Sequence, residues 1–246
     1  PLALVPLIIL GALSIRRGTE AVGHVAAQNL QLVASSTAAR LDQYFTQTQW
    51  LQGAIAKNQV VIKALSTQPA DRKALLQEVE RWMKDLVATN AALALAYIAD
   101  AKGVCIASSS PDMVGRDYSK TREYMRRAIA GENVISDLAV GITTKEPGVF
   151  FSGPVRDRGD KLVGVIVLKL RGEALDRVNL EVGRQTTGGY VVMIDGNGII
   201  ISHPDPKRLY SSLTTLSAET LARIDPKLLY GVDHIENGRQ EELAKE

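Results

Sequence analysis

Two cationic residues and several hydroxyl-bearing ones in the middle of the chain could together bind an anion. Arg122 carries a planar guanidinium that can hold a carboxylate through two hydrogen bonds, and Lys169 carries a compact ammonium charge. The hydroxyl donors that could complete such a site are Tyr124, Thr143, Thr144 and Ser152. Because an unpaired buried charge is costly, a small dianion inside a fold must be met by groups of this kind. These residues predict a binding site for a small carboxylate, with no catalytic residue among them.

Each of these residues also has a purely structural interpretation. Lys169 follows an apolar run, and it would then be the exposed end of a strand. Arg122 would lie on a solvated helix face, and the two threonines would form a polar turn. Tyr124, and Phe151 further along the chain, would be core residues. The sequence leaves both interpretations open.

An internal repeat predicts the elements that position these residues. Residues 96–108 and 191–203 each consist of an apolar run, an Asp, two turn residues, a Gly and a second apolar run. This pattern is typical of a β-hairpin with a short turn. Asp100 and Asp195 lie 95 residues apart, which is too long for a solenoid repeat and suits two small domains in tandem. We therefore expect two related modules in series.

The N-terminal segment predicts a membrane helix that continues into a stalk. Residues 1–15 are uncharged and precede two arginines, but this run is shorter than the roughly 20 residues that cross a bilayer. We interpret residues 1–17 as part of a transmembrane helix, with a signal-peptide core as the alternative. Residues 18–66 contain no Pro and have apolar residues at helical spacing, which predicts one long stalk helix. Its apolar positions suit either pairing with a second copy, as a homodimer, or packing on the chain's own domain.

The rest of the chain predicts a mixed α/β (α+β) fold with two tandem PAS-like antiparallel-sheet modules. The first module, residues 67–180, has five expected strands, and Asp117 or Ser119 can cap its short second helix. Its expected elements are a helix at 72–88, the first hairpin, a short helix ended by Gly131, and strands at 133–140, 148–155 and 162–170. The second module, residues 181–246, has a hairpin and a helical segment from Ser217, and we expect it to be truncated at its C-terminus.

Four short motifs, in this order, resemble those of the double Cache (dCache) family of extracytoplasmic sensor domains in bacterial transmembrane receptors. They are 115–124, 128–131, 148–155 and 164–169. The first contains the Arg-x-Tyr of the family's ligand helix at Arg122 and Tyr124, although five steps separate Asp117 from Arg122 where the family has four. Either Arg122 or Lys120 therefore fills this motif. The resemblance implies a ligand site in the membrane-distal module, with Phe151 among its residues, and a periplasmic or extracellular location from about residue 18.

Lys169 indicates which ligand the resemblance implies. Amino-acid-binding members of the family carry an Asp at this point to hold the ligand's ammonium group, and a cation here would repel that group and attract a carboxylate. The chain is more similar to bacterial C4-dicarboxylate sensor histidine kinases, in which a Lys falls here and a Gly-Thr-Thr-like stretch comes earlier. Residues 141–144 resemble that stretch. A small-molecule carboxylate is thus the expected partner, in preference to an amino acid.

The composition excludes several other classes of function. One Cys and three distant His residues cannot build a disulfide framework or a metal site, and the scattered basic residues, with a net charge of +2, argue against nucleic-acid binding. No catalytic motif is present, so neither a catalytic residue nor a cofactor is expected in this stretch. Enzymatic activity would belong to an output domain such as a histidine kinase; a diguanylate cyclase, a serine phosphatase and a chemoreceptor are alternatives. The competing class is a structural or protein-interaction ectodomain whose cavity is filled by its own side chains.

Overall fold

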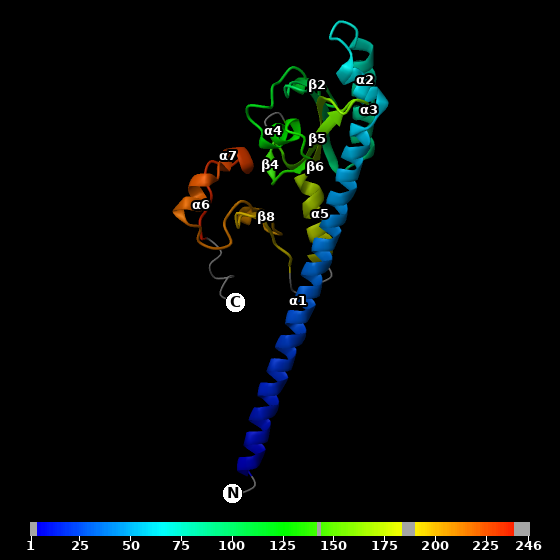
Figure 1. Cartoon of the computed structure of the whole chain (residues 1–246). Helices are drawn as coiled ribbons and strands as arrows, with labels where there is room; N and C mark the ends of the chain where they lie inside the picture. The colour runs from blue at the N-terminus through cyan, green and yellow to red at the C-terminus, as the bar shows by residue number, and fades with distance from the viewer. Residues whose placement is uncertain (1–3, 142–143, 184–189, 239–246) are drawn as a thin grey trace. The chain divides into compact units, whose positions relative to one another are not determined.

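The computed structural model describes residues 4–141, 144–183 and 190–238 (Figure 1). Two compact units make up the chain, residues 1–42 and residues 43–246. The first consists of the N-terminal part of helix α1 (Leu4–Ala56), and the second holds the end of α1 and every other helix and strand. Among the described residues, no helix combines the length and the apolar character that crossing a membrane requires.

The long helix ends earlier than the sequence suggested. Helix α1 ends at Ala56, and a separate helix, α2 (Gln59–Ser66), follows it. Asn58 between them has an extended backbone, and its side-chain oxygen accepts hydrogen bonds from the amides of Val60 (2.8 Å) and Val61 (3.4 Å). Because an Asn in this geometry caps the start of a helix, the chain begins a new helix here. The prediction of one helix across residues 18–66 was therefore wrong at its C-terminal end.

A six-stranded antiparallel sheet forms the first module. The strand order is β2-β1-β6-β5-β3, and β4 pairs separately with β5. The strands are β1 (Leu93–Asp100), β2 (Cys105–Ser108), β3 (Val134–Ile135), β4 (Ala139–Val140), β5 (Pro147–Arg156) and β6 (Leu162–Arg171). Strand β6 lies between β1 and β5, which explains its almost continuous apolar run, because a central strand covered on both faces has no solvated side.

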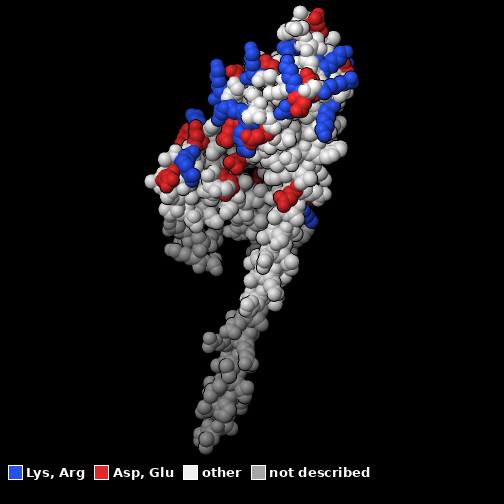
Figure 2. All heavy atoms as spheres, in the orientation of Figure 1, with Lys and Arg blue, Asp and Glu red and all other residues white. Residues whose placement is uncertain are grey.

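Helices cover both faces of this sheet. Leu65 of α2 packs against Gly164 of β6, and α3 (Lys73–Thr89) contacts β1 and β2. Helix α4 (Glu123–Ile129) lies on the opposite face, because its Tyr124 packs with Val167, a residue that alternates with Gly164 along β6. On the side shown in Figure 2, Lys and Arg side chains are interspersed with Asp and Glu over the sheet-bearing module, and neither sign forms a continuous patch there.

One predicted strand is split in two. The sequence predicted a single strand at 133–140, whereas the structure has β3 and β4 with Ser136 between them. The Ser136 amide donates to the Phe150 carbonyl (2.9 Å), and the Ser136 hydroxyl accepts from the Phe150 amide (2.9 Å). A side-chain oxygen thus replaces a backbone carbonyl in the ladder, which interrupts the strand. The extra strand also raises the expected five strands to six.

The two hairpins have the same turn. The Asp100 carboxylate accepts from the amides of residues 102 and 104, and the Asp195 carboxylate accepts from those of residues 197 and 199. Gly103 and Gly198 occupy the same place in the two turns with φ of 89° and 79°, a left-handed conformation that favours glycine. Each hairpin belongs to its own sheet, so the two copies of the repeat do not share one continuous sheet.

The repeat extends further than the sequence pattern revealed. A backbone bridge joins Val104 to Asp117 in the first module and Ile199 to Ser212 in the second. Short 3-10 turns begin at the equivalent Pro111 and Pro206. All of these pairs keep the offset of 95 residues that separates Asp100 from Asp195. Apart from these two prolines, most side chains of this stretch differ between the copies, so the backbone hydrogen bonds are what makes the longer match visible.

The described part of the second module is smaller. Helix α5 (Gly172–Gly183) leads into a two-stranded sheet of β7 (Met193–Ile194) and β8 (Ile200–Ser202). Helices α6 (Ala218–Arg223) and α7 (Pro226–Leu229) follow, and the Ser217 hydroxyl caps α6. The core of this module contains Ile199, Ile224 and Tyr230.

Asp100→Ala is expected to lower the free energy of unfolding by about 1 kcal/mol, because two backbone amides lose their carboxylate partner. Urea denaturation measures the effect, and Lys102→Ala at an exposed position of the same turn is the control. Equal stability of the two variants would show that the glycine, rather than the carboxylate, holds the turn.

Candidate functional site

Lys169 is a fully buried cation in the central strand of the sheet. It stands between Leu95 of β1 and Phe150 of β5 and has 0% exposure. Its Nζ donates to Thr144 Oγ1 (2.7 Å) and to the Glu146 carbonyl (2.7 Å). Burial lowers the pKa of Lys169 to about 8, against the opposing effect of the nearby Glu146 charge. The interpretation of Lys169 as the exposed end of a strand is therefore wrong.

Two glycines leave space for this lysine. A Cβ at Gly148, on the adjacent strand, would lie 2.6 Å from Lys169 Cε. A Cβ at Gly141 would lie 3.0 Å from Lys169 Nζ and would also overlap the Thr144 hydroxyl. Because such distances are too short for carbon, only glycine allows the ammonium to reach Thr144 and Glu146.

Arg122 supplies a second buried cation beside the first. It has 4% exposure, immediately precedes α4, and donates from Nη2 to the Val140 carbonyl (2.6 Å). Its Cζ lies 5.8 Å from the centre of the Phe150 ring, and Lys169 Nζ lies 5.6 Å from the same centre. Within the described parts of the chain, neither cation forms an ion pair with a carboxylate. Two uncompensated positive charges therefore share one aromatic ring, which favours an anion between them.

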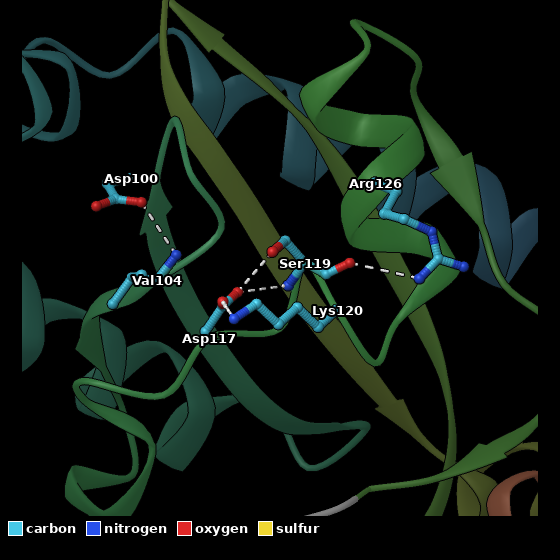
Figure 3. Close-up of polar contacts among 6 residues, drawn as sticks. All are labelled: Asp100, Val104, Asp117, Ser119, Lys120 and Arg126. Atoms are coloured by element: carbon cyan, nitrogen blue, oxygen red, sulfur yellow. Dashed lines mark hydrogen bonds and ion pairs between the residues drawn. The ribbon is translucent and has the colours of Figure 1, made fainter.

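Lys120 does not take part in this site. Its side chain is 84% exposed and pairs with Asp117 at 3.7 Å (Figure 3). Asp117 accepts hydrogen bonds from the Ser119 amide and hydroxyl, which lower the pKa of its carboxyl group. The side chains of Asp117 and Ser119 thus bond to each other within their own turn. Helix α4 begins at Glu123 with no side-chain cap. The prediction that Asp117 or Ser119 caps this helix was wrong, and of the two candidate cations Arg122 is the one that lies near the same Phe150 ring as Lys169.

Aromatic side chains form the wall around the two cations. The Tyr124 ring stacks on Phe150 with centroids 4.6 Å apart, and the Tyr97 and Tyr124 hydroxyls are 3.3 Å apart. Burial raises the pKa of Tyr124 to about 12, so this phenol is neutral near pH 7. A cavity of about 10 Å³ is lined by Leu95, Met113, Tyr118, Arg122, Tyr124, Gly141, Thr144 and Phe150. This volume is at the lower limit for one water molecule.

The remaining predicted residues have different positions. Phe151 points to the other face of the sheet, where its ring packs edge-on against Phe45 of α1 at 5.7 Å, so its prediction as a ligand contact was wrong. Ser152 is on the correct face, but its hydroxyl donates to the Tyr124 carbonyl (3.0 Å). Thr143 lies outside the described residues.

Phe150, which the prediction missed, stands opposite Lys169. Strand alternation from Ser152 was the signal that could have found it.

An antiparallel sheet that follows a long N-terminal helix and carries two buried cations on one face has the features expected of a ligand-sensing module. The chain belongs to the double Cache family, whose profile, described as Cache domain, matches residues 18–244. Cache domains of DctB-like sensors are the extracytoplasmic parts of membrane receptors that act in signal transduction.

A relative from Rhizobium meliloti (strain 1021), the C4-dicarboxylate transport sensor protein DctB, is 29% identical over 160 residues. The match covers 63% of this chain and 24% of that protein, so the chain spans about a quarter of its relative's length. The sensor domain of the Vibrio cholerae histidine kinase DctB has the same fold, with a TM-score of 0.72, 22% identity, and coverage of 85% of this chain and 78% of that one.

Chemoreceptor domains share the fold as well. The sensory domain of Campylobacter jejuni Tlp3 (CcmL), with isoleucine bound, matches with a TM-score of 0.56 and 18% identity over 71% of this chain and 69% of that one. The ligand-binding domain of Pseudomonas fluorescens CtaA, in complex with L-alanine, matches with a TM-score of 0.54 and 19% identity over 76% and 75%. The chain is therefore a Cache sensor domain homologous to DctB, with the fold of chemoreceptor ligand-binding domains.

Proposed function

We propose that this domain binds a small dicarboxylate in its first module, residues 67–180. The observation that carries the proposal is the pair of buried cations, Arg122 and Lys169, with no carboxylate partner in the described parts of the chain. A dianion would compensate both charges. The Thr144 hydroxyl, now bonded to Lys169, and the neutral Tyr124 phenol are further hydrogen-bond donors at the site.

The same geometry disfavours a free amino acid. Its ammonium group would be held close to two cations, and like charges in a site of low dielectric constant repel one another strongly. The relationship to a protein described as a C4-dicarboxylate transport sensor supports the same ligand class.

We further propose that the domain lies outside the cytoplasm, anchored through its N-terminal helix, and reports ligand binding across the membrane to an output domain such as a histidine kinase. The second module would be membrane-proximal, at residues 181–246. Pairing of two copies along α1 is supported by Trp50 and Tyr44, large side chains that are 74% and 39% exposed on that helix.

Isothermal titration calorimetry against succinate, fumarate, malate, L-serine and L-isoleucine tests the ligand class. We expect at least one dicarboxylate to bind at least about tenfold more tightly than either amino acid, because only the dicarboxylate matches two cations in number and sign. Tight binding of an amino acid together with weak dicarboxylate binding would contradict the proposal.

A second candidate function follows from the small cavity. Tyr97, Tyr118, Tyr124 and Phe150 largely fill this face of the sheet and leave only about 10 Å³. A domain packed in this way could act as a structural or protein-interaction module instead of a sensor. Failure of every compound in the calorimetric series to bind would favour this alternative.

A further inference from the structure

Helix α7 of the second module lies against β4 of the first (Figure 1). Leu229 of α7 packs against the cores of both modules. Just after α7, Gly231 has φ of +74°, and a Cβ there would lie 3.1 Å from Val140 Cγ2. The second module thus touches the strand whose carbonyl accepts the hydrogen bond from Arg122.

Arg122 lies at the boundary between the ligand cavity and this contact. Besides lining the cavity of about 10 Å³, it lines two clefts of about 280 Å³ and 460 Å³. Leu228 of α7 lines both clefts. A rotation of the Arg122 guanidinium would therefore change contacts both in the cavity and at α7.

Strand β4 ends next to the cavity and is short. It has two residues and pairs only with β5, through Ala139 with Gly148 and Val140 with Pro147. Gly141, the next residue, lines the cavity directly. A two-residue strand of this kind moves more easily than the long central strands β1 and β6.

We propose that ligand binding in the first module and docking of α7 on β4 oppose each other. The inference rests on the proposed dicarboxylate site. Because the cavity is far smaller than a dicarboxylate, its walls must move outward, and the guanidinium of Arg122 must turn from the Val140 carbonyl toward the ligand. Both changes displace β4 toward α7, so occupancy of the first module loosens its contact with the second. Coupling between two sites is reciprocal, so weakening the contact must strengthen ligand binding.

Leu229→Ala tests this coupling in the whole chain, with succinate titrated by calorimetry. We expect the variant to bind succinate roughly fivefold more tightly than the unmodified protein. Leu216→Ala is the matched control, because Leu216 packs in the core of the second module and is absent from the described core of the first. The control should leave the affinity unchanged.

A second measurement keeps the inference testable if Leu229→Ala disturbs folding. Hydrogen exchange of the amides of residues 227–231 should become faster when succinate saturates the unmodified protein. Unchanged or slower exchange, or an unchanged or weaker affinity of a folded Leu229→Ala variant, would overturn the coupling alone. Failure of the unmodified protein to bind any dicarboxylate would overturn the proposed function and the coupling with it.

Discussion

Lys169→Met is expected to weaken dicarboxylate binding by at least about a hundredfold, because the ligand loses one of its two buried counter-charges. Methionine fills much of the slot that Gly148 leaves for the lysine side chain but carries no charge. Calorimetry with succinate measures the loss. Lys120→Met is the matched control: it removes the same charge from an exposed position two residues before Arg122 and should bind as the unmodified protein does.

Thermal unfolding of Lys169→Met separates this explanation from simple misfolding. The substitution removes two hydrogen bonds, to Thr144 and to the Glu146 carbonyl, but it also removes a buried charge that has no ion-pair partner in the described parts of the chain. These two effects offset each other, so the melting temperature without ligand should stay close to that of the unmodified protein. Undiminished succinate binding by this variant would show that Lys169 has a structural role only.

The sequence was most informative where one residue contradicted its surroundings. A lysine at the end of an otherwise apolar run is either a strand end or a buried cation, and only the pairing of β6 with strands on both sides decides between them. The hairpins were predictable because an Asp and a Gly determine the turn through local hydrogen bonds. The choice of Phe151 instead of Phe150 was an error of strand parity, since neighbouring residues face opposite sides of a sheet.

Other features of the site depend on contacts between distant segments. The hydrogen bond from Arg122 to the Val140 carbonyl joins the start of α4 to β4, a two-residue strand that is too short to show a periodic pattern in the sequence. The split at Ser136 depends on the position of Phe150 across the sheet. The contact of Leu229 with the first module depends on how the second module packs. Sequence patterns report local preference, so the groups that could bind an anion were recognisable while the small volume of the cavity was not.

Succinate affinity is expected to fall as the pH rises through about 8, the pKa of buried Lys169. The ammonium form binds the dianion, and its population falls about tenfold for each pH unit above the pKa, so the affinity should drop roughly a hundredfold between pH 7 and pH 10. Burial is the main cause of the lowered pKa; Arg122 and Arg171 add to it, and Glu146 opposes it. The buried Tyr124, with a pKa of about 12, stays neutral over most of this range.

Loss of the Lys169 proton should raise the free energy of unfolding, although it weakens ligand binding. The pKa of Lys169 is lower in the folded protein than in the unfolded chain, so the cost of burying its charge is fully present below pH 8. That cost is relieved as the pH rises from about 8 toward 10.5, where the unfolded chain also loses its proton. Denaturant unfolding at a series of pH values should therefore show that Lys169 contributes rising stability over the range in which ligand binding weakens. Lys169→Met should lack this contribution.

Proton uptake on binding gives the decisive measurement. At pH 8.5 about three quarters of the Lys169 side chains are neutral before ligand is added, and the dianion draws a proton onto each as it binds. Calorimetry of succinate binding in two buffers of different ionisation enthalpy should then report an uptake of about 0.7 proton per ligand at pH 8.5 and close to none at pH 6.5. Equal affinity at pH 7 and pH 10 with no proton uptake would mean that the lysine either keeps its charge throughout or does not meet the ligand. A fall in affinity that coincides with alkaline unfolding would point to loss of the fold, whereas deprotonation of Lys169 must weaken binding by a protein that remains folded.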